Sequence, residues 1–151
     1  MKTFVRKKES KEGRYLHAVD EERIYEKRGF TDAILEKLKP KLVYSYGVYA
    51  GTLKSGELLS VENFIPEEVM ETERQNNSPT LKDFFNVAKD EPRAFFMAYV
   101  VPKERPDERI TVEGACVPSE RTDLVEYLRE KALYPPDEEG DWKEFYCMWW
   151  D

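Results

Sequence analysis

Residues 93–101 read RAFFMAYVV, and this stretch decides the fold. In an extended chain, alternate side chains point to opposite faces, and both faces of this segment are apolar. One face carries Phe95, Met97, Tyr99 and Val101, and the other carries Ala94, Phe96, Ala98 and Val100. A strand of this kind is typical of the interior of a sheet that is covered on both sides.

The next apolar segment, RITVEGACV at 109–117, alternates between apolar and polar residues. We expect Ile110, Val112 and Cys116 to face the core, and Arg109, Thr111 and Glu113 to face water. The two segments are separated by the polar stretch PKERPDE, which is suited to a loop. Together they predict two strands, one buried on both faces and one with a wet face.

Further elements can be placed on either side of this pair. Helices are predicted from Asp20 to Arg28, from Thr31 to Lys39, from Pro79 to Glu91, and after a cap at Ser119. Strands are predicted at 2–8, 14–19, 42–53, 57–64 and 142–150. Hairpins alternating with single helices indicate one α+β domain, residues 1–151, with a mainly antiparallel mixed sheet and helices mostly on one face.

The predicted strand at 42–53 is rich in tyrosine and glycine. Tyr44 and Tyr46 point to one face and Tyr49 to the other, while Gly47 and Gly51 leave room for the close approach of a backbone or a ligand. We expect these tyrosines to contribute to a binding surface.

The segment WKEFYCMWWD, residues 142–151, contains all three tryptophans of the chain. As one strand it has two largely apolar faces, so we expect it to pair within the sheet and close the core. One aromatic face could also be left for a partner. In the arrangement compatible with both, Phe145 and Trp149 lie inside, whereas Trp142, Tyr146 and Trp150 form a contact surface or pocket, since Trp and Tyr are enriched at interfaces.

Composition limits the possible partners and location. The net charge of −7 and pI near 5.0 argue against binding to nucleic acid or anionic membranes. We see neither a secretory signal nor an apolar run long enough to cross a bilayer, so a cytoplasmic protein is expected. A charged fraction of 36% with few amide side chains favours a thermophilic source.

Few residues are candidates for chemistry. Glu62 and Glu113 are expected within strands, where a carboxyl group beside aromatic rings could act as a general acid. Cys116 and Cys147 are expected as buried apolar side chains; Cys116 could be a reactive thiol, and the two could pair if their strands are neighbours. The single histidine, His17, argues against a zinc site, and no cofactor or metal is predicted.

These observations favour a non-catalytic binding or protein-interaction module. Its site would be an aromatic-lined pocket for a small apolar or planar ligand, or a face for a protein partner or a second copy in a homo-oligomer. The alternatives are a small enzyme, a hydrolase or transferase using a carboxylate or thiol, and an acidic inhibitor that mimics nucleic acid.

Overall fold

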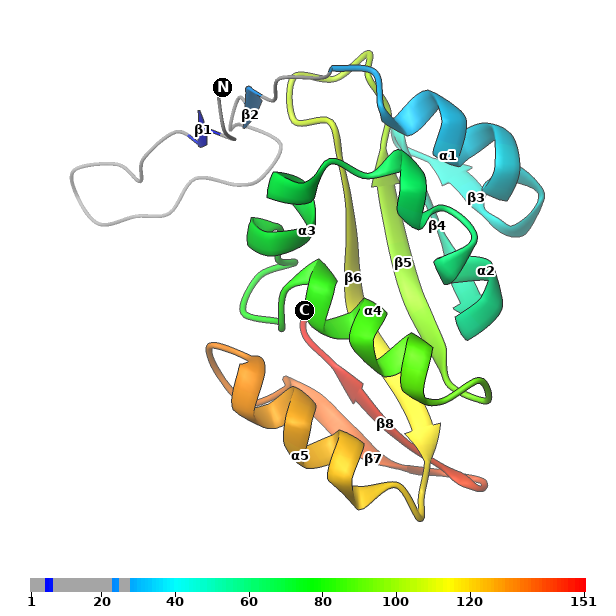
Figure 1. The fold of residues 1–151 in the computed structure, drawn as a ribbon, viewed down its shortest axis with the longest axis vertical. Helices are drawn as coiled ribbons and strands as arrows, with labels where there is room; N and C mark the ends of the chain where they lie inside the picture. The colour runs from blue at the N-terminus through cyan, green and yellow to red at the C-terminus, as the bar shows by residue number, and fades with distance from the viewer. Residues whose placement is uncertain (1–4, 7–22, 25–27) are drawn as a thin grey trace.

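A computed structural model describes residues 5–6, 23–24 and 28–151 (Figure 1). Its main feature is a six-stranded sheet in the order β3-β4-β5-β6-β8-β7, in which every neighbouring pair is antiparallel. The strands are β3 (Val43–Ser45), β4 (Val48–Lys54), β5 (Phe95–Val101), β6 (Arg109–Pro118), β7 (Glu138–Trp142) and β8 (Phe145–Trp149). The central strands of this sheet are β5 and β6, as the apolar segments predict.

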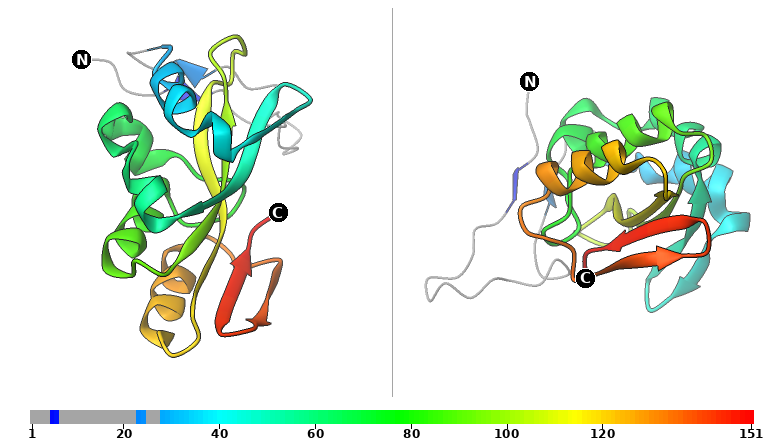
Figure 2. Two further views of the ribbon diagram at one scale, coloured as in Figure 1. Left: turned by 90° about the vertical axis from the view of Figure 1, so that its right-hand side faces the viewer. Right: turned by 90° about the horizontal axis from the view of Figure 1, so that it is seen from below.

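The described helices lie on one side of this sheet, which Figure 2 shows from two directions. They are α1 (Thr31–Leu38), α2 (Ser55–Leu59), α3 (Glu67–Thr72), α4 (Leu81–Asp90) and α5 (Thr122–Lys131), with short 3-10 turns η2 (Lys39–Lys41) and η3 (Glu62–Phe64). This is a single-domain α+β arrangement with helices on one face, so the predicted fold class is confirmed.

The long central helix shows why the chain folds in this way. Thr80 caps α4 by accepting a hydrogen bond from the backbone N–H of Asp83, while the Asp83 carboxylate accepts one from the N–H of Thr80 at 2.9 Å. The predicted apolar stripe, Leu81, Phe84, Phe85 and Ala88, is buried against the sheet. The Phe84 ring lies edge-on to Phe96 of β5, with 6.2 Å between centroids.

One expectation for β5 is wrong, and the difference is important for function. Phe96, Ala98 and Val100 are buried under the helices, but Phe95, Met97 and Tyr99 on the opposite face are only partly buried. Since the described helices all lie on one side, this second apolar face of the sheet is left without a helical layer (Figure 2).

A β-bulge in β6 changes the expected faces of that strand. Met97 pairs with Gly114 and Ala98 pairs with Val112, so Glu113 is the extra residue. Beyond the bulge the alternation is reversed, and Cys116 therefore lies on the face opposite the helices. Before the bulge, Arg109 and Thr111, expected to be exposed, are buried; Arg109 donates to the Asp107 carboxylate at 2.8 Å and Thr111 to the Gln75 side chain at 2.8 Å.

The segment from 42 to 64 also differs from the prediction. The chain reverses at Tyr46 and Gly47, whose φ angles are +52° and +84°, so the expected strand is a hairpin of β3 and β4. The second expected strand, 57–64, is instead α2 and η3.

A further turn divides the expected strand at 142–150. Lys143 has a φ of +57°, and Trp142 pairs with Phe145 across the hairpin of β7 and β8. Trp142 therefore ends β7, whereas Trp149 ends β8 and Trp150 directly follows it.

The N-terminal predictions fall largely outside the described residues. Arg23 and Ile24, expected in a helix, form strand β2 and pair with β1 (Val5–Arg6). The rest of the helix predicted from Asp20 to Arg28, the arm at 14–19 and His17 lie outside the described residues, apart from Arg28.

Candidate functional site: a hollow on the open face of the sheet

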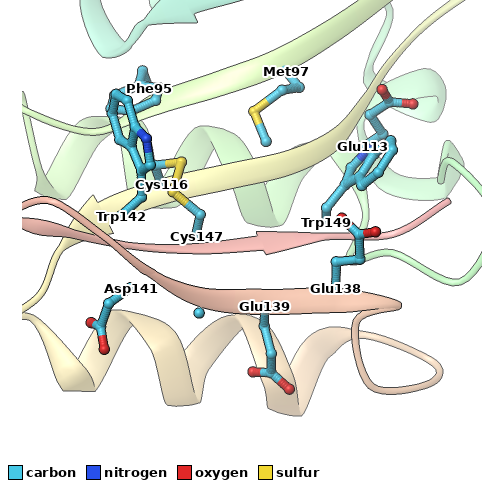
Figure 3. Close-up of a pocket in the computed structure, with 11 residues that line it drawn as sticks. Phe95, Met97, Glu113, Cys116, Glu138, Glu139, Asp141, Trp142, Cys147 and Trp149 are labelled. Carbon is cyan, nitrogen blue, oxygen red and sulfur yellow. A yellow bond between two sulfur atoms is a disulfide. The ribbon is translucent and has the colours of Figure 1, made fainter.

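The face of the sheet opposite the helices carries a hollow of about 550 Å³, here called the open-face hollow (Figure 3). It is built from aligned rows of residues across β5, β6, β8 and β7. One row contains Met97, Gly114, Trp149 and Glu138, and the next contains Phe95, Cys116, Cys147 and Gly140. Its volume is within the range typical of small-molecule sites.

Aromatic side chains form the two ends of the hollow. At one end Trp142 lies edge-on to Phe95, with 6.2 Å between ring centroids, and Phe95 lies 5.0 Å from Phe145. At the other end stands Trp149, beside Glu113 and Glu138, while Met97 lies along the side (Figure 3). The long axis of the hollow therefore runs from Trp142 to Trp149.

Glycine residues and a disulfide leave the middle of the hollow free of bulky side chains. A Cβ added to Gly140 would meet nothing within 4 Å, so this position opens a gap in β7 between Glu138 and Trp142. A Cβ at Gly114 would lie 2.5 Å from the Met97 methyl group and 2.8 Å from the Met148 carbonyl oxygen. Gly114 is therefore required where Met97 and Trp149 lie close over the backbone.

Cys116 and Cys147 are bonded to each other in this structure, with 4.1 Å between their Cα atoms. They are directly opposite residues of β6 and β8, so their strands are neighbours, as pairing requires. Neither is a free thiol, and Cys116 as a reactive nucleophile is therefore wrong for this state of the protein. The disulfide lines the hollow and joins the two strands beneath it.

The bulge places Glu113 at the Trp149 end of the hollow. Its side chain is half-buried, and this burial raises the pKa of the Glu113 carboxyl above its usual value; a hydrogen bond from Trp149 opposes the shift, and the charge of Asp151 adds to it. Glu138 lies directly across from Trp149. Within the described part of the chain, no lysine or arginine forms an ion pair with Glu113 or Glu138.

A basic side chain marks the opposite end. The Lys143 ammonium lies 4.9 Å from the centroid of the Trp142 ring, at cation–π distance. Beyond Phe95 and Phe145, an adjoining hollow of about 570 Å³ is lined by Lys41, Lys54 and Arg93. The Trp149 end is thus acidic. Past Trp142, basic side chains outnumber Asp141 and Glu57, although Lys41 and Arg93 pair with Glu57 and Glu91.

The three tyrosines predicted as binding residues lie elsewhere, at the hairpin of β3 and β4 on the opposite edge of the sheet. Tyr46 is 98% exposed at the tip of the turn, and Tyr44 is exposed beside it. Tyr49 packs partly against the core; its ring lies 4.7 Å from Tyr44, and the Lys39 ammonium lies 5.8 Å from its centroid. The sheet separates these residues from the open-face hollow.

The proposed grouping of Trp142, Tyr146 and Trp150 is not found. Trp150 is fully buried under α4, where its Nε1 donates to the Tyr134 carbonyl at 2.9 Å and its ring lies edge-on to Phe84. Tyr146 faces α5 and donates to Glu139 at 2.8 Å, and this hydrogen bond raises the pKa of the phenol. Of the three, only Trp142 lines the hollow.

Glu62 lies in η3 and not in a strand. Its carboxylate forms an ion pair with Lys89 at 2.8 Å, so it is not set among aromatic rings as expected. In the described ranges, no group of three or more His, Cys, Asp or Glu side chains could hold a metal ion. Over the same ranges, no helix is long and apolar enough to cross a membrane.

The chain matches no protein-family model, no curated protein and no solved structure. The site must therefore be interpreted from its geometry alone. Sequence reasoning missed Phe95, Met97 and Trp149 as site residues because it assigned both faces of their strands to the interior. The available signal was the apolar second face of 93–101 in a chain whose predicted helices lie mostly on one side.

Proposed function

We propose that this protein is a non-catalytic binding module, and that the open-face hollow takes a small ligand with an apolar or planar body. The observation that carries the proposal is the set of partly exposed apolar side chains that no described helix covers: Phe95, Met97, Trp142 and Trp149. A concave apolar surface with a few polar groups at its rim is the usual form of a small-molecule site.

The fixed frame of the hollow and its lack of nucleophilic side chains also support a binding site. Its floor is held by the ladder of β6, β8 and β7 and by the disulfide, so the site is formed before a ligand arrives. The residues that line it provide neither a hydroxyl group nor an imidazole, and both cysteines are bonded.

The test uses the three tryptophans as internal reporters. Titration of protein carrying ¹⁵N-labelled tryptophan with neutral 2-phenylethanol should shift the indole N–H signals of Trp142 and Trp149. The buried Trp150, which donates to Tyr134, should not respond. If no indole signal shifts, or if all three shift equally, the hollow is not the binding site.

A matched pair of glycine variants sharpens this test. Gly140→Leu fills the hollow, and Gly56→Leu adds the same side chain on α2, where a Cβ also meets nothing within 4 Å. We expect Gly140→Leu to weaken the titration and Gly56→Leu to leave it unchanged. Equal effects of the two variants would contradict the proposal.

A second candidate function is self-association through the hairpin of β3 and β4. Tyr46 is almost fully exposed and has a φ of +52°, a conformation that costs a non-glycine residue free energy and is therefore associated with functional positions. Light scattering on the purified protein tests this: a dimer that Tyr46→Asn dissociates would support it, and a monomer at all concentrations would contradict it.

A third candidate is the carboxylate enzyme, for which the raised pKa of Glu113 inside the hollow is the favourable observation. A general acid would lose its activity in Glu113→Gln, whereas a binding site of the proposed kind would still take a neutral ligand.

A further inference from the structure

The two ends of the open-face hollow differ in charge, and this difference defines a ligand more closely than its apolar lining does. Trp149 is flanked by Glu113 from the β6 bulge and by Glu138 from the opposite position on β7. The charge of Asp151 also acts on Glu113. Two carboxylates therefore flank one indole ring.

The carboxylates elsewhere on the protein are frequently paired. Glu91 bonds Arg93 and Arg121, and Glu62 bonds Lys89. Glu113 and Glu138 have no such partner among the described residues. Glu113 is half-buried beside the apolar hollow, where an unpaired charge is poorly solvated, and Glu138 is exposed at the rim. A positive group on a ligand would satisfy both of them.

The aromatic lining suits the same kind of group. Cations bind over the faces of tryptophan rings within about 6 Å of the centroid, most strongly where water is partly excluded. The Lys143 ammonium, 4.9 Å from the Trp142 centroid, already occupies such a position at the other end of the hollow. Trp149 has carboxylates beside it and no described lysine or arginine at cation–π distance from its ring.

We propose that the ligand of the open-face hollow is an organic cation, an ammonium group joined to an apolar or aromatic body. This inference rests on the proposed function of the hollow as a small-molecule site. The ammonium lies over Trp149 between Glu113 and Glu138, and the body extends past Met97, the disulfide and Gly140 towards Phe95 and Trp142. The cationic Lys143 fixes this orientation, because it repels a second positive charge at the Trp142 end.

The experiment compares three ligands that share one ring and differ in charge: phenethylamine (positive), 2-phenylethanol (neutral) and phenylacetate (negative). Each is titrated at pH 7 and constant ionic strength, and the indole signals of Trp142 and Trp149 are followed. We expect phenethylamine to bind about tenfold more tightly than 2-phenylethanol, and phenylacetate to bind most weakly.

The outcomes separate this inference from the proposed function. If all three ligands bind equally well, or if the neutral ligand binds best, the inference is overturned while the small-molecule site stands. If none of the three shifts Trp142 or Trp149, both proposals fail.

A matched pair of variants tests the role of the carboxylate. Glu113→Gln keeps the shape of the side chain and removes its charge, and Glu130→Gln makes the same change on the exposed surface of α5. We expect Glu113→Gln to lose most of the preference for phenethylamine over 2-phenylethanol, and Glu130→Gln to keep it. A preference that persists in Glu113→Gln and in the double variant Glu113→Gln/Glu138→Gln would overturn the inference.

Discussion

Glu113 shows how one inserted residue creates a chemical site. Without the bulge, the alternation of β6 would continue unbroken, and no additional side chain would enter the row beside Trp149. The bulge instead holds a carboxyl group against an indole, where desolvation raises the pKa of the carboxyl. This local cost is typical of positions retained for binding.

The raised pKa predicts a pH-dependent stability. A carboxyl whose pKa is higher in the folded protein than in the unfolded chain stabilises the fold when protonated, and this contribution is lost as the pH rises above its ordinary value of 4.5. The nearby charge of Asp151 acts in the same direction, and a hydrogen bond from Trp149 opposes it. Glu113→Gln should therefore unfold at a higher urea concentration than the wild type at pH 7, and at a similar one near pH 3. A lower midpoint at pH 7 would contradict the assigned direction.

Glu108 is a second residue whose effect can be predicted. It is fully buried and accepts hydrogen bonds from the N–H of Gly29 at 2.9 Å, from the N–H of Thr31 at 3.1 Å and from the Thr31 hydroxyl at 2.6 Å. It thereby satisfies the free N–H groups at the start of α1, which lacks a side-chain cap of its own.

Glu108→Ala leaves these donors buried without an acceptor, so we expect a loss of roughly 3 kcal/mol in the free energy of unfolding. Glu104→Ala, an exposed glutamate in the same loop, should change it by less than about 0.5 kcal/mol. Urea denaturation measures both, and similar losses for the two variants would show that Glu108 does not cap α1.

At the scale of elements, the joint between β6 and β8 combines a backbone ladder with the bond between Cys116 and Cys147. The disulfide closes a loop with a sequence separation of 31, which includes α5 and β7. On the chain-entropy model, a loop of this length contributes about 3–4 kcal/mol by restricting the unfolded chain.

The double variant Cys116→Ala/Cys147→Ala should therefore have a lower Tm than the wild type, and a reducing agent should not change this Tm. Reduction should lower the Tm of the wild type. Thermal unfolding with and without dithiothreitol tests this. A wild type whose Tm does not change on complete reduction would contradict the assigned contribution.

Particular elements show how far the sequence predicts this fold. The stripe of α4 and the apolar run of β5 follow from hydrophobic periodicity, which determines which residues face the core. The turns were missed because their signal is short: Tyr46-Gly47 has a tyrosine in place of the usual Asn, and Lys143-Glu144 has neither residue of the usual Asn-Gly pair. The bulge at Glu113 has only a weak local signature, the glycine that follows it at 114, since its position depends on how β6 pairs with β5.

The site was predicted less well than the fold for the same reason. Trp142 was grouped with Tyr146 and Trp150 as a contact surface, but its neighbours in space, Phe95 and Met97, come from a strand some forty-five residues earlier. Only the pairing of β5, β6, β8 and β7 brings them together. The second apolar face of 93–101 was interpreted as buried. Because the described helices lie on one side of the sheet, it is instead the main indication of a binding surface.

For the whole molecule, the position of Trp150 determines whether the β7–β8 hairpin unfolds with the rest. The backbone N–H of Trp150 donates to the Glu113 carbonyl at 2.8 Å, and the indole ring packs on Phe84 of α4 in the common core. The hairpin is thus attached to the sheet by the ladder, and to the helical layer by Trp150, by the buried Met148 and by Tyr146 against α5. We expect the described domain to unfold as one cooperative unit.

Two probes test this cooperativity, because all three tryptophans lie in the β7–β8 segment while the helices are distributed from residue 31 to 131. In urea, tryptophan fluorescence and far-ultraviolet circular dichroism should give coincident transitions.

Trp150→Ala should lower the midpoints of both transitions together. We expect it to reduce the free energy of unfolding by about 3–5 kcal/mol, because it leaves a cavity between α4 and the sheet. Trp142→Ala should cost far less, because Trp142 is 52% exposed. A fluorescence transition that precedes the loss of helix would show instead that the hairpin detaches on its own, and the open-face hollow would then be a less stable site than its frame indicates.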